Sequence, residues 1–217
     1  MLLKNMTRKR LLDYLVTQLD HLMPDSRPVR PEIDRHLDQA LTRLQHLING
    51  VRMWPTNEFD YLHSTQYAIF LYLIANSIWR EEKTELAREV CTKLFVLNKT
   101  LNGIDCFFEI ELPEVFFIGH TVGIVLAKAT YGNRLVLYQN STVGKNHGIA
   151  PVIGDDVVLY PNTSIIGRCQ IGNGTVISQG TNVINRDTPG DCLAFPGEGG
   201  NLVFKPVTRS FHNDFFR

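Results

Sequence analysis

Apolar residues in the first hundred positions recur every three or four places, the spacing that forms one face of an α-helix. Two such stripes are clear: Leu12, Leu15, Leu19 and Leu22, and then Ile33, Leu37, Leu41, Leu44 and Ile48. Pro31 near the start of the second stripe and Gly50 after its end are typical helix start and stop signals. We expect a third helix from about Thr56 to Trp79, and a fourth that carries the chain to Gly103. Residues 1–102 are therefore predicted to form an α-helical domain.

After Gly103 the pattern changes, and in the later part it becomes a strict repeat of six. The apolar members of the repeat are Ile153, Leu159, Ile165, Ile171, Ile177 and Val183. Small or apolar residues follow four places after the first five of these, at Val157, Thr163, Cys169, Thr175 and Thr181. A period of six suits neither an amphipathic helix nor a simple hairpin, but it is typical of short strands stacked as coils of a parallel β-helix. The predicted fold class is thus α+β, with a β-helix domain and a tail in residues 103–217.

An earlier register of the repeat does not join the later one evenly. The series Leu112, Ile118 and Ile124 slips by one place before it resumes at Leu137 and Val143. Four further residues must leave the coil between Gly144 and Pro151, where the sequence reads GKNHGIAP. We expect a protruding loop that carries His147, since a solenoid often places binding groups outside its repeat. A tolerated surface insertion is the alternative.

Composition narrows the class of partner and the compartment. The 22 basic residues balance the 22 acidic ones, so no overall field attracts nucleic acid, and we expect a small-molecule or protein partner. Cys91, Cys106, Cys169 and Cys192 show no CxxC pairing or zinc-ligand spacing, which favours reduced thiols in the cytoplasm and no metal. The longest apolar run, residues 67–79, is too short to span a bilayer and predicts a buried helix.

The segment GIDCFFEIELPEVFFIGH, residues 103–120, places Asp105 and His120 at the two ends of an apolar run. A histidine can accept the proton of an attacking hydroxyl at neutral pH, and a carboxylate on its other ring nitrogen would fix the tautomer. This pair is our candidate for catalysis by proton transfer. In the structural alternative, Asp105 caps the start of the solenoid and His120 is a hydrogen-bonded core residue.

Together the helical domain, the hexapeptide repeat, the Asp–His spacing and the loop resemble the serine acetyltransferase family. Residues 103–125 are similar to the family's segment in which Asp and His have the same spacing, and QNSTVGKNHGIAP to a shortened form of its His-bearing loop. The resemblance implies a left-handed β-helix that assembles as a homotrimer or a dimer of trimers, with acetyl-CoA between subunits. It implies catalytic roles for His120 and Asp105 and, less directly, for His147. The coenzyme-binding positions that it implies are Gly144, Tyr160, Pro161, Ser178, Gln179 and Lys205.

Differences from the family concern the acceptor and not the catalytic pair. Gly119 stands where the family has an Asp that helps to hold the amino acid acceptor, and Asn146 stands where an Arg precedes the second His. We therefore expect an acetyl-CoA-dependent O-acetyltransferase whose acceptor is a sugar hydroxyl of a surface polysaccharide or its precursor. The alternatives are a serine O-acetyltransferase, an N-acyltransferase of an amino sugar, and a non-catalytic trimeric scaffold. A metal-dependent carbonic anhydrase would need three convergent histidines, and only His120 and His147 lie in the solenoid body.

Overall fold

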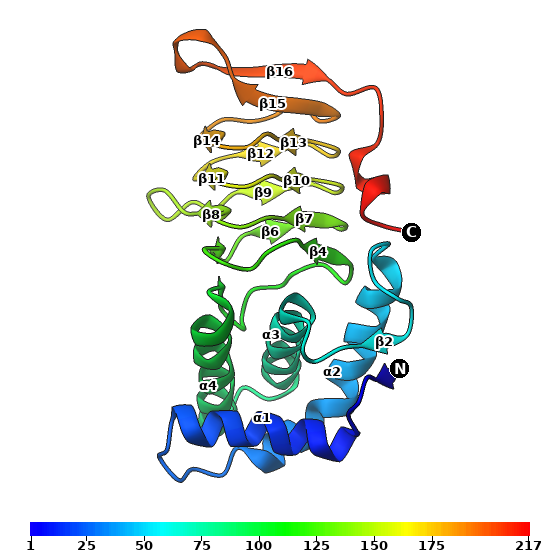
Figure 1. Ribbon diagram of the computed structural model, residues 1–217. Coiled ribbons are helices and arrows are strands. Elements are labelled where there is room, and N and C mark those ends of the chain that lie inside the picture. The colour runs from blue at the N-terminus through cyan, green and yellow to red at the C-terminus, as the bar shows by residue number, and fades with distance from the viewer. The chain divides into compact units, whose positions relative to one another are not determined.

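The computed structural model describes residues 1–217, which form two compact units (Figure 1). The helical unit contains residues 1–49 and 54–109, and the solenoid unit contains residues 50–53 and 110–217. Residues 103–109 thus group with the helices. The whole has the predicted class, a helical part followed by a parallel β-helix. No helix has both the length and the apolar character needed to cross a membrane.

The helical unit has the four helices that the stripes predict: α1 (Arg8–Leu22), α2 (Arg30–Gly50), α3 (Ser64–Glu81) and α4 (Glu85–Asn102). Side-chain oxygens of Thr7 and Thr84 accept hydrogen bonds from the first turns of α1 and α4, which satisfies amide groups that the helix itself leaves unpaired. Gly103 ends α4 in the left-handed conformation, at φ 66°. The apolar run in α3 is buried on almost every side, as predicted.

The third helix begins later than we predicted from the sequence, at Ser64 and not near Thr56. Pro55 and Asn57, the latter with φ 58°, hold the intervening chain in a non-helical path. There β2 (Glu58–Phe59) pairs in parallel with β1 (Leu2–Leu3), and the Nδ1 atom of His63 then caps α3. The short parallel strand pair had no recognisable signal in the sequence.

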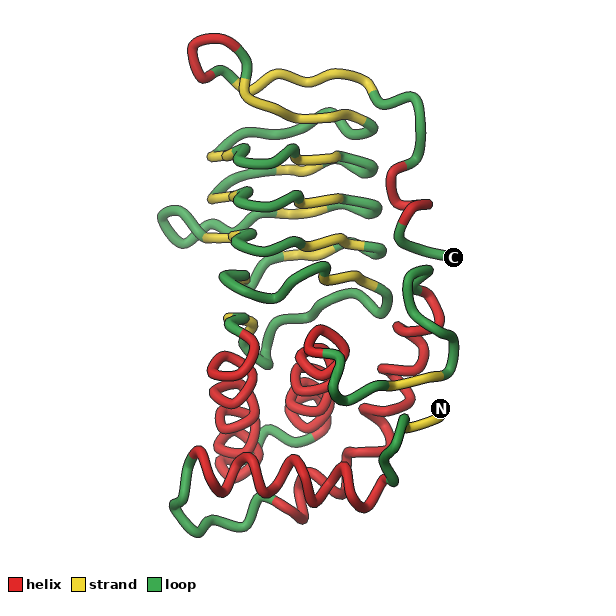
Figure 2. Tube along the Cα trace, in the orientation of Figure 1, coloured by secondary structure: helices red, strands yellow, loops and turns green.

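The solenoid unit is built from short parallel strands that stack into three faces (Figures 1 and 2). The first face contains β4 (Phe116–Ile118), β7 (Leu135–Leu137), β10 (Val158–Leu159), β13 (Val176–Ile177) and β15 (Cys192–Pro196), with β16 (Leu202–Pro206) antiparallel at its edge. The second contains β5 (Val125–Leu126), β8 (Thr142–Gly144), β11 (Ser164–Ile166) and β14 (Asn182–Ile184). The third contains β6 (Thr130–Tyr131), β9 (Val152–Ile153) and β12 (Gln170–Ile171). The remaining short strand, β3 (Asp105–Cys106), lies in the helical unit.

The apolar members of the repeat point inward and stack, as the period of six predicts. On the first face Ile118, Leu137, Leu159 and Ile177 pair in register, and their exposed fractions are at most 2%. Val143, Ile165 and Val183 do the same on the second face, where each is fully buried. This apolar column keeps the turns of successive coils in line, at about 4.8 Å per coil.

Three corners join the faces, and we name them by the strands that precede them. The first corner contains the turns after β4, β7, β10 and β13; the second follows β5, β8, β11 and β14; the third follows β6, β9 and β12. The irregular register has two sources. The first-corner turn of the first coil, residues 119–124, is longer than its copies at 138–141, 160–163 and 178–181. The predicted loop at residues 145–151 then extends the second corner.

The tail, residues 207–217, returns from the last coil to the first (Figure 1). Val207 donates a backbone hydrogen bond to Asp191, and His212 lies 3.5 Å from the carboxylate of Asp156. Phe215 then packs against Phe117 at a ring distance of 5.6 Å. The side chains that point outward from the first face, Val136, Val158 and Val176, are at most 1% exposed, whereas those at the matching places of the other faces are half-buried or exposed. We attribute this burial to the tail.

Candidate active site

The first corner presents two straight rows of side chains along the solenoid. Gly119, Tyr138, Tyr160 and Ser178 each follow directly after an inward-pointing residue, and their amides donate to the coil above at 2.8–3.1 Å. Gln139, Pro161 and Gln179 come next along the chain and form the second row. In the longer turn of the first coil, His120 follows Gly119, and the carbonyl of Val122 accepts from Asn140 just as those of Gln139 and Pro161 accept from Asn162 and Gly180. The predicted base therefore shares one corner with four of the six predicted coenzyme-binding positions.

His120 lies in the enlarged turn of this corner, residues 119–124, and its side chain is exposed. The turn ends at Gly123, whose φ of 75° is matched by Asn140, Asn162 and Gly180 at the corresponding places of the other turns. The buried neighbour Thr121 and the inward Ile124 anchor the turn to the core. The structure thus holds the imidazole at the surface, which argues against the alternative in which His120 is a buried core residue.

Gly119 is in close contact with the ring of Tyr138 from the next coil. A Cβ atom at position 119 would lie 2.5 Å from Cε1 and 2.6 Å from Cδ1 of Tyr138. The backbone of Gly119 does not have the positive φ that favours glycine, so the ring, not the chain conformation, excludes a side chain here. Tyr138 is half-buried, and burial together with the neighbouring Tyr160 raises its pKa.

Asp105 belongs to the helical unit, where it is the first residue of β3, directly after α4 and its capping residues. Its carboxylate pairs with the ammonium group of Lys99, at 2.6 Å. About a third of the side chain is exposed, so the ion pair is partly solvated. Because His120 belongs to the solenoid unit, the pairing of Asp105 with His120 stays a prediction.

His147 lies at the tip of the predicted loop on the second corner. Asn146 and Ile149 exchange two backbone hydrogen bonds of 3.0 Å, and His147 and Gly148 between them both have positive φ, at 48° and 79°. This is the pattern of a two-residue type I′ hairpin. His147 is exposed. Within one chain the two histidines therefore occupy different corners of the solenoid.

Comparison with known proteins agrees with this geometry. The model of the bacterial transferase hexapeptide (six repeats) family matches residues 150–185. The chain is 29% identical over 121 residues to a serine acetyltransferase of Synechococcus elongatus, covering 52% of this chain and 48% of the relative. It is 33% identical over 174 residues to the plasmid serine acetyltransferase of the same organism, covering 73% of this chain and 52% of the relative. The chain thus spans about half the length of these curated relatives.

A solved structure extends the similarity to both units. The serine acetyltransferase of Vibrio cholerae superposes with a TM-score of 0.66 over 96% of this chain and 84% of that one, at 19% identity. At this identity the match establishes the fold, a helical part followed by a left-handed β-helix. This chain is thus similar to serine acetyltransferases, and residues 150–185 carry the hexapeptide repeat of bacterial transferases.

In this serine acetyltransferase-like protein, the predicted coenzyme positions fall in three places. Tyr160, Pro161, Ser178 and Gln179 line the first corner, and the Gln179 carboxamide is exposed. Gly144 ends β8 next to the second corner, where Ile166 would lie 2.7 Å from an added Cβ. Lys205 is exposed on β16, opposite Leu193. These residues fit part of acetyl-CoA. The first-corner row with the exposed carboxamide of Gln179 suits the pantetheine arm, and the exposed ammonium group of Lys205 suits a phosphate.

Two residues that we had not singled out from the sequence lie in these rows. Tyr138 contacts Gly119, and Gln139 follows Tyr138 along the chain, with its Oε1 atom buried and without a hydrogen-bond partner. The repeat itself could have revealed them. They occupy the two places after the inward Leu137, just as Gly119 and His120 follow Ile118.

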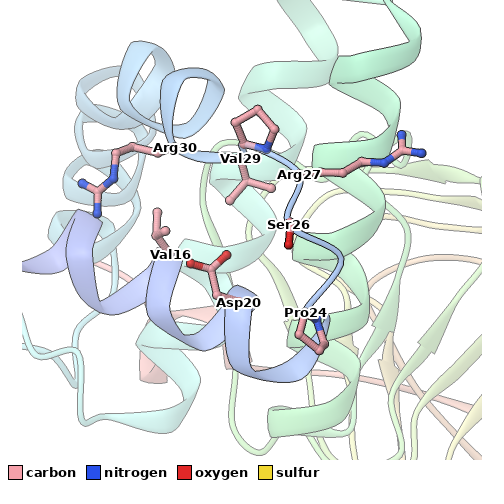
Figure 3. A pocket seen from close by; sticks show the side chains of 8 residues that line it. Val16, Asp20, Pro24, Ser26, Arg27, Val29 and Arg30 are labelled. Carbon is pink, nitrogen blue, oxygen red and sulfur yellow. The ribbon is translucent and has the colours of Figure 1, made fainter.

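Other groups in the serine acetyltransferase-like protein show no comparable arrangement. Glu32, His36 and Glu82 bring potential metal-ligand atoms within 4.8 Å of one another, but the guanidinium group of Arg35 pairs with both carboxylates and supplies the cation. A hollow of about 450 Å³ lies between α1 and the 24–30 segment of the helical unit (Figure 3). Its charged residues include Arg27 and Arg30, which pair with Glu89 and Asp13.

Proposed function

We propose that this protein is an acetyl-CoA-dependent O-acetyltransferase in which His120 takes the proton of the acceptor hydroxyl. The observation that carries the proposal is the common corner: an exposed histidine lies in the same corner of the solenoid as four predicted coenzyme-binding residues. The names of the relatives support the same class of reaction. A solenoid that served only as a scaffold would have no need for this alignment.

The chemistry follows from these positions. The acceptor oxygen forms a bond to the acetyl carbonyl carbon, the bond from that carbon to sulfur breaks, and the hydroxyl proton passes through His120 to the departing sulfur. A base in position contributes about 10²- to 10⁴-fold, and the alignment of two substrates along one corner supplies part of the rest. In this proposal Asp105 holds the imidazole from its other nitrogen, in competition with Lys99.

The acceptor has two main candidates. L-Serine is favoured by the names of the relatives, and it is the first compound to assay. A neutral hydroxyl compound such as a sugar of a surface polysaccharide, our expectation from the sequence, is favoured by the contact between Gly119 and Tyr138. An amino sugar would give an amide and not an ester, so product analysis separates N-acylation from both.

The proposed assembly is a homotrimer, or a pair of trimers. Since His120 and His147 lie on different corners of one chain, a site that used both would need the loop of a second copy. Four free, buried cysteines support a cytoplasmic location, where thiols stay reduced. Sedimentation equilibrium tests the assembly, and a purely monomeric species would exclude a shared site.

Replacement of the base tests the proposed function. His120→Ala should lower the release of coenzyme A from acetyl-CoA, in the presence of an accepted hydroxyl compound, by about 10²- to 10⁴-fold. The circular dichroism spectrum and thermal midpoint should stay close to those of the wild type, because the side chain is exposed. His21→Ala, at an exposed site in α1, is the matched control. Wild-type turnover by His120→Ala would remove the proposed base.

A further inference from the structure

The first corner differs from the other two in charge. Its four turns, residues 119–124, 138–141, 160–163 and 178–181, contain no Asp, Glu, Lys or Arg. The turns of the second corner contain Lys128, Lys145, Arg168, Arg186, Asp187 and Asp191, and those of the third contain Arg134, Asp155 and Asp156. Apart from His120, the turns of this corner present only hydroxyl, amide and apolar side chains.

Tyr138 forms a wall against Gly119, the residue before His120, and several neighbours hold its ring in place. Its ring stacks on that of Tyr160, at 5.6 Å and an angle of 20°. The rings of Phe117 and Phe215 meet it edge-on, at 6.5 and 6.3 Å. Such offset and edge contacts are favourable arrangements for aromatic rings. Because neighbours hold the ring on several sides, position 119 has no room for a side chain of any kind, charged or neutral.

The two tyrosines also supply polar groups at this wall. Neither phenol hydroxyl makes a hydrogen bond within the chain, and both residues are half-buried in the turns of the first corner. Tyrosine in such a setting offers a flat apolar surface with a donor at its edge. A zwitterion would meet no fixed counter-charge in these turns.

We infer that Tyr138 determines the acceptor of this site, and that the acceptor is a neutral polyhydroxy compound with an apolar ring face, such as a pyranoside. The inference rests on the proposed function, because it names the substrate of the same site. Tyr138 would contact the acceptor directly and would exclude a side chain at position 119. His120 would then receive the proton from one of the acceptor hydroxyls.

The first test compares acceptors of different charge. Methyl β-D-galactopyranoside and methyl β-D-glucopyranoside serve as neutral ring probes, L-serine as the zwitterion, and N-acetyl-L-serinamide as a neutral compound with the same reacting group as serine. We expect kcat/KM for at least one pyranoside to exceed that for L-serine by tenfold or more. We also expect N-acetyl-L-serinamide to exceed L-serine. A wild-type preference for L-serine over all neutral probes would overturn the inference while the proposed function stood.

The second test is a pair of variants. Tyr138→Ala should lower kcat/KM for the pyranoside at least tenfold with little change in the KM for acetyl-CoA, whereas Tyr138→Phe should keep the ring contact and lose only the hydroxyl. Gly119→Ala should also lower kcat/KM for the pyranoside. In the double variant, Gly119→Ala with Tyr138→Ala, the fold-loss in kcat/KM should be smaller than the product of the two single fold-losses. Equal ratios of pyranoside to serine activity in wild type and Tyr138→Ala would contradict the role of Tyr138.

Binding separates failure of this inference from failure of the proposed function. Saturation-transfer NMR with the same pyranosides and with L-serine needs no turnover. If no probe releases coenzyme A but the pyranoside binds and Tyr138→Ala abolishes that binding, the proposed reaction fails and the neutral-ligand site remains. If L-serine binds and the pyranosides do not, the inference fails. Thermal unfolding of each variant shows whether a loss arises from the site or from a fold that no longer forms.

Discussion

At the scale of single residues, some structural features could be predicted from the sequence and others could not. The apolar residues of the six-residue repeat could be predicted to stack, because only one side of each strand can face the narrow interior. The position of His120 at the surface could not, because its turn is longer than the other first-corner turns and burial depends on that local path. The contact of Gly119 with Tyr138 was equally hidden, since it joins residues from neighbouring coils.

The four cysteines give a prediction at this scale. All are buried and free, and burial raises the pKa of Cys91 to about 12 and also raises that of Cys106. Because the thiolate is the reactive form, Cys91 and Cys106 should stay unreactive at pH 8, and burial should shield all four thiols from reagents until the chain unfolds. Ellman's reagent at pH 8 should detect none of the four in the native protein and all four in guanidinium chloride.

Reaction of one thiol in the native state within minutes would show that its part of the core opens readily. The same measurement has a practical use. Coenzyme A release can be followed with this reagent only if the protein's own thiols are silent, so the burial of Cys91 and its three counterparts makes the activity assay interpretable.

Elements were predicted with uneven success, and the errors have physical causes. The four helices and the coils followed from periodicity, and the loop at residues 145–151 followed from the interruption of the repeat. The start of α3 was placed too early because an apolar pattern does not show that Asn57 has left-handed backbone geometry or that His63 caps the helix. The enlarged turn at 119–124 shows in the sequence only as a slip of one, because the second corner of the first coil, from Leu126 to Tyr131, is one residue shorter than that from Ile165 to Ile171 and offsets part of the gain.

The loop gives a prediction at the scale of elements. Replacement of residues 145–151 by the three-residue turn of the next coil, residues 167–169, should change the free energy of unfolding by less than about 1 kcal/mol, because loop closure depends only weakly on length. Urea unfolding measures this effect. Activity should fall about 100-fold if His147 acts in the reaction.

His147→Ala in the intact loop is the matched variant for this replacement. Equal losses in the two variants would assign the effect to the imidazole, and a loss only in the shortened loop would assign it to the hairpin as a whole. Full activity in both would leave the loop without a role in the chemistry.

At the scale of the whole molecule, the tail joins the last coil to the first. The backbone carbonyl of Phe215 accepts from Arg52 at 2.7 Å, and Arg217 donates to Gly50 at 2.9 Å. Phe215 is 7% exposed and reaches Tyr138, so the tail also supports the ring that lies against Gly119. None of this followed from the sequence, because a single aromatic pair near residue 215 carries no periodicity that would show where it packs.

The tail gives the last prediction. Phe215→Ala should lower the free energy of unfolding by about 3 kcal/mol, as expected for a buried phenylalanine, and should release the ring of Tyr138 on one side. Arg209→Ala, in an exposed ion pair of the same tail, should cost less than about 1 kcal/mol. Urea unfolding at matched protein concentration compares them. A smaller loss for Phe215→Ala than for Arg209→Ala would show that the aromatic contact does not hold the tail.

The return of the tail changes how the solenoid can come apart. In a simple array of coils each repeat touches only its neighbours, so an end can fray without disturbing the middle. Here residues 50–53 and 215–217 meet although more than 160 positions separate Val51 from Arg217. Before the last coil can unwind, the tail must lose its contacts with residues 50–53 and with Phe117 of the first coil. The two ends of the solenoid should therefore unfold in one cooperative transition. Closure of so long a segment is slow, so we expect the coils to form before the tail seals them.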